Sequence, residues 1–172
     1  MKKILSILVI GVLLTSLSVS GVFSKELSPT PFPSSYELFY PVVAGKTPAD
    51  KYYFVKTIRE WIVDKLLFDP IKNVDYHLTL SKKRLVESER LIADKSYQLA
   101  AKSVNNSFLE LKKASKKAKT VSPNTDIIDT IKSVSNTESD FIEMSLVKNV
   151  PESEKQSFSE TAKEIKVFLD QI

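Results

Sequence analysis

The sequence predicts an all-α fold, a helical bundle of about five amphipathic helices, and three observations lead to it. All three glycines lie at or before Gly45, so the rest of the chain lacks the residue that favours tight hairpins and sheet bulges. After that point, apolar residues recur at three- and four-residue spacing in five successive segments. Prolines stand between these segments, where they open a helix more readily than they continue one. These prolines are Pro48, Pro70, Pro123 and Pro151.

The first two helices are expected to belong to a three-helix unit that contains a helical hairpin core. Thr47 is the predicted cap of the first helix, and Asp69 caps the second, which opens at Pro70. The core-facing stripe of the first helix is predicted to be Phe54, Val55, Ile58, Trp61, Ile62 and Leu66. The stripe of the second is predicted to be Ile71, Val74, Leu78, Leu85 and Ile92. A break is expected near residues 94–96, because an unbroken helix to Lys119 would be about 75 Å long.

Three further helices follow with the same periodicity. The stripe of the third is Tyr97, Ala101, Val104, Phe108, Leu111 and Ala118. That of the fourth is Ile127, Ile128, Ile131, Val134, Phe141 and Ile142, and that of the fifth is Phe158, Ala162, Ile165, Phe168, Leu169 and Ile172. Each stripe is expected to be buried against another helix. We therefore predict a three-helix unit over residues 47–120 and a C-terminal helical pair over 121–172 that packs on it.

The first 46 residues have a different composition. Residues 1–24 combine Lys2 and Lys3 with an apolar run and small residues, which is the layout of a signal peptide. Cleavage after Ser20 or Ser24 is one prediction, and retention as a signal anchor through residues 4–23 is the other. Residues 25–46 are predicted to be a Pro-rich extended linker, whose aromatic second half docks onto the helices.

The signal-like segment is expected to place the helices outside the cytoplasm, and the composition narrows the possible partners. In both interpretations of residues 1–24 the rest of the chain is extracytoplasmic: secreted, periplasmic or at the cell surface. The chain contains no cysteine, which excludes disulfides, a lipid-modified cysteine and thiolate catalysis. Its net charge is only +4, so an exported chain of this kind is not expected to bind nucleic acid.

Lysines are concentrated near the end of the third predicted helix. From Lys95 to Thr120 the sequence has seven lysines and one acid, Glu110. The densest run consists of Lys112, Lys113, Lys116, Lys117 and Lys119. Its ordinary interpretation is a solvated helix end, where cations offset the helix dipole. Its sharper interpretation is contact with an anionic surface, either lipid headgroups or cell-wall polymers.

No residue pattern indicates reaction chemistry. His77 is the only histidine, and no acid lies three or four residues from it, so a metal site or acid–base pair would need residues from other helices. We expect a partly buried or surface histidine. A glycine-rich phosphate loop is excluded after Gly45. The sequence therefore predicts no catalytic residue, no metal ligand, no cofactor and no enzyme activity.

Several residues together resemble a bacterial family of exported or membrane-anchored helical domains of unknown function. They lie within residues 52–118: Tyr53 to Lys56 and Glu60, then Leu67-Phe68-Asp69-Pro70, His77-Leu78, Arg84-Leu85-x-Glu87 and Leu91. Where this family usually has a glycine, the chain has Asp94-Lys95-Ser96. The resemblance implies an α-helical, extracytoplasmic protein without a known reaction. We interpret Arg84 and Glu87, one turn apart, as a structural ion pair that supports the hairpin.

These patterns favour a non-enzymatic exported helical module that contacts another protein or a component of the cell envelope. The alternative is an extracytoplasmic sensor or a chaperone-like stress protein, which would bind a ligand or an unfolded client between its helices. The identity of the partner is not encoded in any motif of the sequence.

Overall fold

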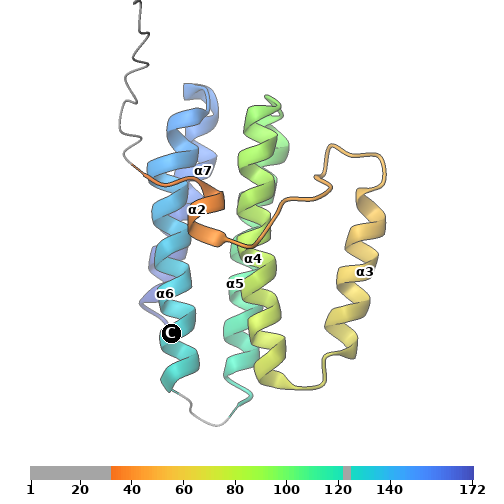
Figure 1. Cartoon of the computed structure of the whole chain (residues 1–172). Helices are drawn as coiled ribbons and strands as arrows, with labels where there is room; N and C mark the ends of the chain where they lie inside the picture. Colours follow the sequence, from red (N-terminus) through yellow and green to blue (C-terminus); the bar gives the residue numbers. More distant parts are fainter. Residues whose placement is uncertain (1–31, 122–124) are drawn as a thin grey trace, which may run out of the picture. The chain divides into compact units, whose positions relative to one another are not determined.

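Helices α4 (Pro70–Ala93) and α5 (Tyr97–Ala118) form an antiparallel hairpin, the longest pair in this computed structural model, which describes residues 32–121 and 125–172 (Figure 1). Helix α4 begins where the sequence predicts. The Asp69 carboxylate accepts hydrogen bonds from the backbone nitrogens of Ile71 at 2.9 Å and Lys72 at 3.3 Å. Pro70 occupies the first turn, where its missing N–H costs nothing.

The predicted break at residues 94–96 is confirmed, and it is a Schellman turn. The backbone nitrogen of Lys95 donates to Ile92 O at 2.9 Å, and that of Ser96 donates to Leu91 O at 2.8 Å. This geometry places Lys95 in the left-handed region, with φ +58°. The hairpin therefore closes without glycine, at the cost of a side chain in a conformation that glycine adopts more readily.

Replacing Lys95 with glycine is expected to stabilise the protein by about 0.5–1 kcal/mol, because glycine removes the steric cost of the positive φ. The free energy of unfolding in urea measures the effect. The matched control is Lys102→Gly within α5, which we expect to destabilise the protein by about 1 kcal/mol, since φ there is helical. Equal destabilisation by both substitutions would show that the turn at Lys95 is unstrained.

The C-terminal helices complete the bundle. Helix α6 (Thr125–Phe141) continues into a π-helical turn, η1 (Ile142–Leu146), and a 3₁₀ turn, η2 (Val147–Asn149). Pro151 then stands directly before α7 (Glu152–Leu169), as predicted. Helices α6 and α7 pack against each other and against α5. Residues 1–31, including the predicted signal segment, and the turn around Pro123 lie outside the described residues.

A short helix, α2 (Ser35–Phe39), lies within the segment predicted to be an extended linker. The Ser34 hydroxyl and the Glu37 carboxylate form a capping box at its start, which explains the local helical turn. Phe39 is 3% exposed, and its ring centroid lies 5.4 Å from that of Phe141. The prediction that the second half of this segment docks onto the helices is therefore confirmed.

Helix α3 (Tyr53–Leu66) begins five residues later than predicted. The Asp50 carboxylate accepts hydrogen bonds from Thr47 N at 2.5 Å and from Thr47 Oγ1 at 3.1 Å. These bonds close a separate turn at residues 47–50, so Thr47 and Pro48 precede the helix instead of starting it. Figure 1 shows α3 at one edge of the bundle, beside α4.

The predicted all-α bundle is confirmed: six α-helices and no strand occur in the described residues. The core is built from α4, α5, α6 and α7, with η1, Phe39 of α2 and Val150. Its largest fully buried apolar side chains are Phe141, Phe158, Leu85, Leu91, Leu111, Ile131, Ile142, Leu146 and Ile165. No described core residue lies on α3. Among the described helices, none is both long enough and apolar enough to cross a membrane.

Candidate functional site

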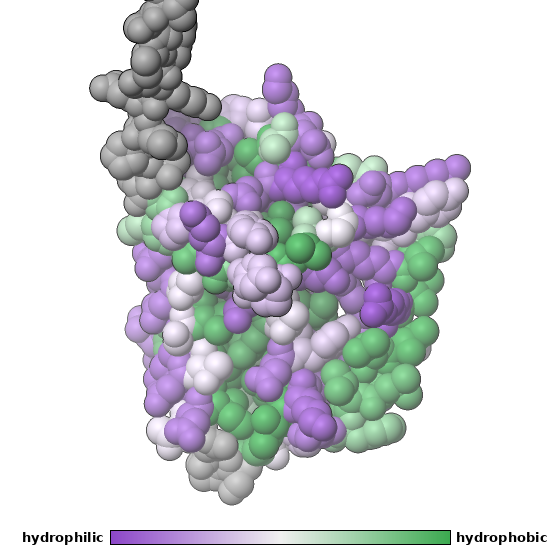
Figure 2. All heavy atoms as spheres, viewed as in Figure 1, coloured by the Kyte–Doolittle hydropathy of each residue, from purple (hydrophilic) through white to green (hydrophobic). Residues whose placement is uncertain are grey.

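Helix α3 turns its apolar side away from the bundle, so the predicted core stripe of this helix is wrong. The six residues of that stripe, hereafter the apolar face of α3, are 44–64% exposed. They are Phe54, Val55, Ile58, Trp61, Ile62 and Leu66. The only buried residue of the helix is Glu60, at 9%. Figure 2 shows hydrophobic surface gathered on the side of the molecule where α3 lies.

A second stripe of the same helix faces α4 instead, and it is polar. Tyr53, Lys56, Glu60 and Asp64 are spaced by three and four residues, so they share one side of α3. Their partners on α4 recur with similar spacing. We call the combined set the α3–α4 polar interface: Tyr53, Lys56, Glu60 and Asp64 with Asn73, His77, Lys83, Arg84 and Glu87.

Arg84 lies at the centre of this interface and is 6% exposed. Its guanidinium bonds Glu87 on its own helix, with Nη1 2.9 Å from Oε1, and forms a short ion pair with Glu60 on α3. Burial lowers the pKa of Arg84, but the charges of Glu87 and Glu60 outweigh it and raise the pKa above its ordinary value. The predicted Arg84–Glu87 ion pair is confirmed, and it also holds α3 to the hairpin.

Lys56 and Tyr53 of α3 complete the coordination of Glu87, which is fully buried. Lys56 Nζ forms a short ion pair with that carboxylate, and it also donates to Ala44 O at 2.9 Å and to Lys46 O at 2.7 Å. The Tyr53 hydroxyl donates to Glu87 Oε2 at 3.1 Å. Burial lowers the pKa of Lys56, an effect that the hydrogen bond and charge of Glu87 oppose.

His77 forms a second polar cluster near the other end of α3, and the expectation of a partly buried or surface histidine is wrong: it is 1% exposed. Nδ1 lies 2.7 Å from Glu110 Oε2 on α5, and Nε2 lies 3.1 Å from Asp64 Oδ1 on α3. The two ring nitrogens of His77 therefore join an acid of α5 to an acid of α3. Both acids come from other helices, because α4 has no acid three or four residues from His77.

Glu110 links this cluster to the predicted lysine run. Lys113 Nζ lies 2.8 Å from Glu110 Oε1. Burial raises the pKa of Glu110, but hydrogen bonds from His77 and Lys113 outweigh burial and lower the pKa below its ordinary value. In the described residues, no group of three or more acids, histidines or cysteines could hold a metal ion.

The rest of the lysine run lies in the last turns of α5. Lys112 Nζ stands 4.2 Å from the centroid of the Phe108 ring, a cation–π contact. Lys116 and Lys119 are exposed, and Lys117 is half-buried. Because α3 is joined to the start of α4, and α5 runs antiparallel to α4, these lysines lie at the end of the bundle where α3 ends (Figure 1).

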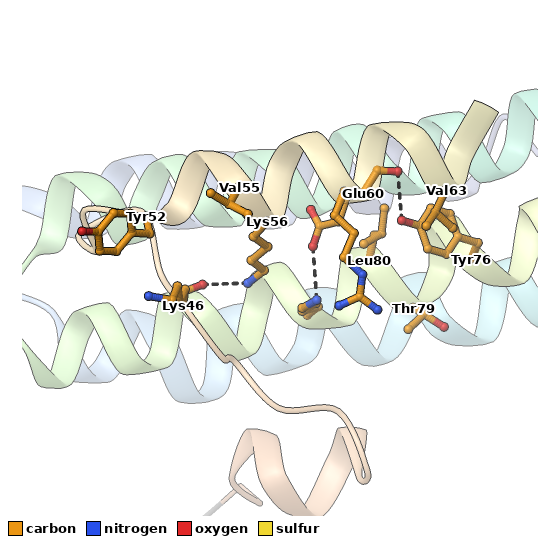
Figure 3. A pocket seen from close by; sticks show the side chains of 11 residues that line it. Lys46, Tyr52, Val55, Lys56, Glu60, Val63, Tyr76, Thr79 and Leu80 are labelled. Atoms are coloured by element: carbon orange, nitrogen blue, oxygen red, sulfur yellow. Dashed lines mark hydrogen bonds and ion pairs between the residues drawn. The ribbon is translucent and has the colours of Figure 1, made fainter. Parts of the chain in front are cut away.

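A cavity of about 440 Å³ opens between α3 and α4, beside the polar interface. Figure 3 shows Val55, Glu60 and Val63 of α3 on one side, and Thr79 and Leu80 of α4 on the other. Lys46, Arg59 and Lys83 add positive charge to its lining. The cavity is partly apolar, and no nucleophile–base pair faces it among its lining residues.

One buried acid in the core was not singled out by the sequence. Glu138 of α6 is fully buried, and its Oε2 lies 2.5 Å from Ser81 Oγ, which lies 2.9 Å from Ser107 O. Ser81 has one hydroxyl proton and cannot donate it to two acceptors, so a protonated Glu138 completes the chain to the Ser107 carbonyl. Burial raises the pKa of Glu138 to about 8, although Ser81 and Lys82 act in the opposite direction.

Comparison with known proteins gives a match to a protein family. Residues 45–167 match the family described as Domain of unknown function (DUF5667). This matched range is longer than residues 52–118, which carry the resemblance found in the sequence. No curated protein and no solved structure matches the chain. The matched range contains α3 and the whole polar interface.

Proposed function

The chain belongs to the DUF5667 family, a family of unknown function, and on that premise we propose that it is a non-enzymatic contact module of the cell envelope whose contact surface is the apolar face of α3. One observation carries the proposal: the amphipathic helix turns its polar side inward and leaves six large apolar side chains in solvent. A surface helix normally packs its apolar side against the core and turns its polar side to solvent. Exposed apolar patches of this kind mark interaction sites on soluble domains.

The polar interface supports the proposal because it fixes the rotation of α3. Burying ion pairs contributes little net stability, since desolvation offsets most of the attraction between the charges. Such pairs can instead specify one orientation, because any other rotation of α3 would take Glu60 away from Arg84, and Lys56 away from Glu87. We infer that the Arg-Leu-x-Glu element of the sequence serves this purpose.

The proposed location is extracytoplasmic. The support is the signal-like sequence of residues 1–24. The proposed module has no catalytic residue and no cofactor, and its partner is a protein or an envelope component. Cleavage or retention of residues 1–24 decides whether it works free or tethered, and the mass of the mature N-terminus distinguishes the two.

Site-specific photo-crosslinking tests the contact surface without assuming the partner. Benzoylphenylalanine replaces Ile58 on the apolar face of α3 in the full chain, in the cells that naturally produce it. We expect a discrete adduct, with protein or with lipid, because Ile58 is 52% exposed and lies within the face.

The matched control is the same probe at Val167 on α7, which is apolar and 58% exposed. Adducts that are no more abundant at Ile58 than at Val167 would contradict the proposal. A third position, Thr79, lines the cavity between α3 and α4. Adducts confined to Thr79 would favour the alternative function, the binding of a ligand or client between helices.

A further inference from the structure

We propose that the apolar face of α3 binds the surface of an anionic phospholipid bilayer; this inference rests on the proposed function and names its partner. Helix α3 has 14 residues and is therefore about 21 Å long. Its apolar face combines Phe54 and Trp61 with aliphatic side chains, and Phe68, just beyond its end, is 87% exposed. Aromatic and aliphatic side chains on one side of a helix are typical of helices that lie in the membrane interface.

The charges around the apolar face distinguish a lipid surface from other partners. Both acids of α3, Glu60 and Asp64, are bonded to α4 through Arg84, Lys83 and His77. The charges that α3 presents to solvent are those of Arg59 and Lys65, which are both basic. The polar interface therefore removes negative charge from the side of the helix that would meet an anionic surface.

A neighbouring part of the bundle adds charge of the same sign. The exposed members of the lysine run belong to the last turns of α5, and α5 ends at the same end of the bundle as α3 (Figure 1). The chain Asp64–His77–Glu110–Lys113 connects the two regions through side-chain contacts. In the proposed complex, the lysine run and the apolar face of α3 contact the same anionic surface.

A second copy of the chain fits these charges less well. A two-fold symmetric contact through the apolar face of α3 would bring Arg59 and Lys65 of one copy toward the same residues of the other. Like charges at the edge of an interface oppose its formation. An anionic bilayer, in contrast, supplies the opposite charge along the whole helix.

The chain preceding the bundle is compatible with this partner. If residues 4–23 stay in a bilayer, as the signal-anchor interpretation has it, only residues 24–31 separate them from the described part of the chain. A chain of eight residues reaches at most about 28 Å, whatever its conformation. Binding by α3 would then be intramolecular on the same membrane and favoured by a high local concentration.

Trp61 is the only tryptophan of the chain, and it lies on the apolar face at 62% exposure. Its fluorescence therefore reports on α3 alone, even in the full chain, whose residues 4–23 bring their own affinity for lipid. We expect vesicles of phosphatidylglycerol and phosphatidylcholine to shift Trp61 emission to shorter wavelength. Brominated acyl chains in those vesicles should quench it.

The double substitution I58E/I62E places charge in the apolar face while keeping Trp61 as the probe. Both isoleucines are exposed, so the fold is expected to persist, which circular dichroism checks. The apparent affinity reported by Trp61 should fall about tenfold or more. The matched control V167E on α7 should leave it unchanged. R59Q/K65Q should weaken binding to anionic vesicles and reduce its dependence on salt.

Three outcomes would overturn the proposal. Equal quenching of Trp61 in vesicles of phosphatidylcholine alone would show that binding does not depend on anionic lipid. A shift that depends on protein concentration without lipid would assign the apolar face to a second copy. No response of Trp61 to any vesicle would exclude a bilayer; if crosslinks at Ile58 persist in that case, the proposed contact function stands and only its lipid partner is wrong.

Discussion

Replacing Arg84 with methionine is expected to release helix α3 from the bundle. The substitution leaves two acids, Glu60 and Glu87, without their main partner in a buried site. Removing one member of a buried ion-pair cluster costs about 3–5 kcal/mol when the remaining charge stays buried. When α3 separates from α4, water reaches both carboxylates. The free-energy cost of local opening is therefore lower than that of keeping the two charges buried.

The loss should be local because α3 takes no part in the core. Only Glu60 of this helix is buried, and none of the described core residues belongs to it. The α4–α5 hairpin and the C-terminal helices keep their apolar contacts when α3 leaves. Segments with few buried apolar contacts open at lower free energy than the rest of a protein.

Hydrogen exchange followed by mass spectrometry measures this release. In R84M, backbone amides of residues 57–66 should lose protection, while those of residues 74–92 should keep it. Lys102→Met, at an exposed position of α5, is the matched control and should change neither. Protection of α3 that survives in R84M would contradict the central role of Arg84.

A triple substitution separates charge from packing. With Glu60, Arg84 and Glu87 replaced by leucine, methionine and leucine, the three buried charges at the centre of the cluster are gone, and α3 can dock through apolar contact. Lys56 loses the Glu87 carboxylate but keeps its hydrogen bonds to Ala44 O and Lys46 O. Replacement of a buried ion-pair network by apolar residues of similar volume is often neutral or stabilising. Protection of α3 should therefore return, at least in part, relative to R84M.

The structure explains why the sequence predicted α3 itself but not its orientation. Periodicity gives the helix, because both of its stripes recur at helical spacing. The choice between the stripes depends on α4, where Arg84 and Glu87 offer partners to Glu60 and Lys56. That choice is a tertiary property. The only signal in the sequence is that the polar residues of both helices also follow the three- and four-residue spacing.

Local chemistry was more predictable than contacts between helices. Asp69 and Pro70 start α4 through bonds within three residues, and the turn at residues 94–96 depends on its own backbone. His77, in contrast, meets acids that lie 13 and 33 residues away in the sequence. Glu138 lies seven residues after Ile131, on the same side of α6, but its residue type gives no reason to expect burial.

Stability is expected to fall as pH rises from about 4.5 to about 8 because of Glu138. Burial raises the pKa of this carboxyl from its ordinary value of 4.5 to about 8, so the folded protein keeps a proton that the unfolded chain loses. Between these two values the folded state binds more protons, and unfolding becomes easier with increasing pH. Each pKa unit corresponds to about 1.4 kcal/mol, which gives an upper bound of about 5 kcal/mol.

Glu110 acts in the opposite direction at lower pH. Its pKa is lowered in the folded state, so its ionised form contributes stability that is fully present above about pH 4.5. That contribution is lost as the pH falls through the folded-state pKa. With respect to these two carboxyls, the protein should be most stable near pH 5 and lose stability on both sides.

Glu138→Gln should remove most of the decline between pH 5 and pH 8. The glutamine amide can donate to Ser81 Oγ, as the protonated acid does, and it carries no proton to lose. Near pH 5 the variant should match the natural protein in urea unfolding, and at pH 8 it should be more stable by a few kcal/mol. The matched control, Glu164→Gln at an exposed position of α7, should leave the pH profile as it is. A variant less stable than the natural protein at pH 8 would mean that Glu138 is buried as an ion, because only a charged carboxylate loses a favourable interaction when it becomes an amide.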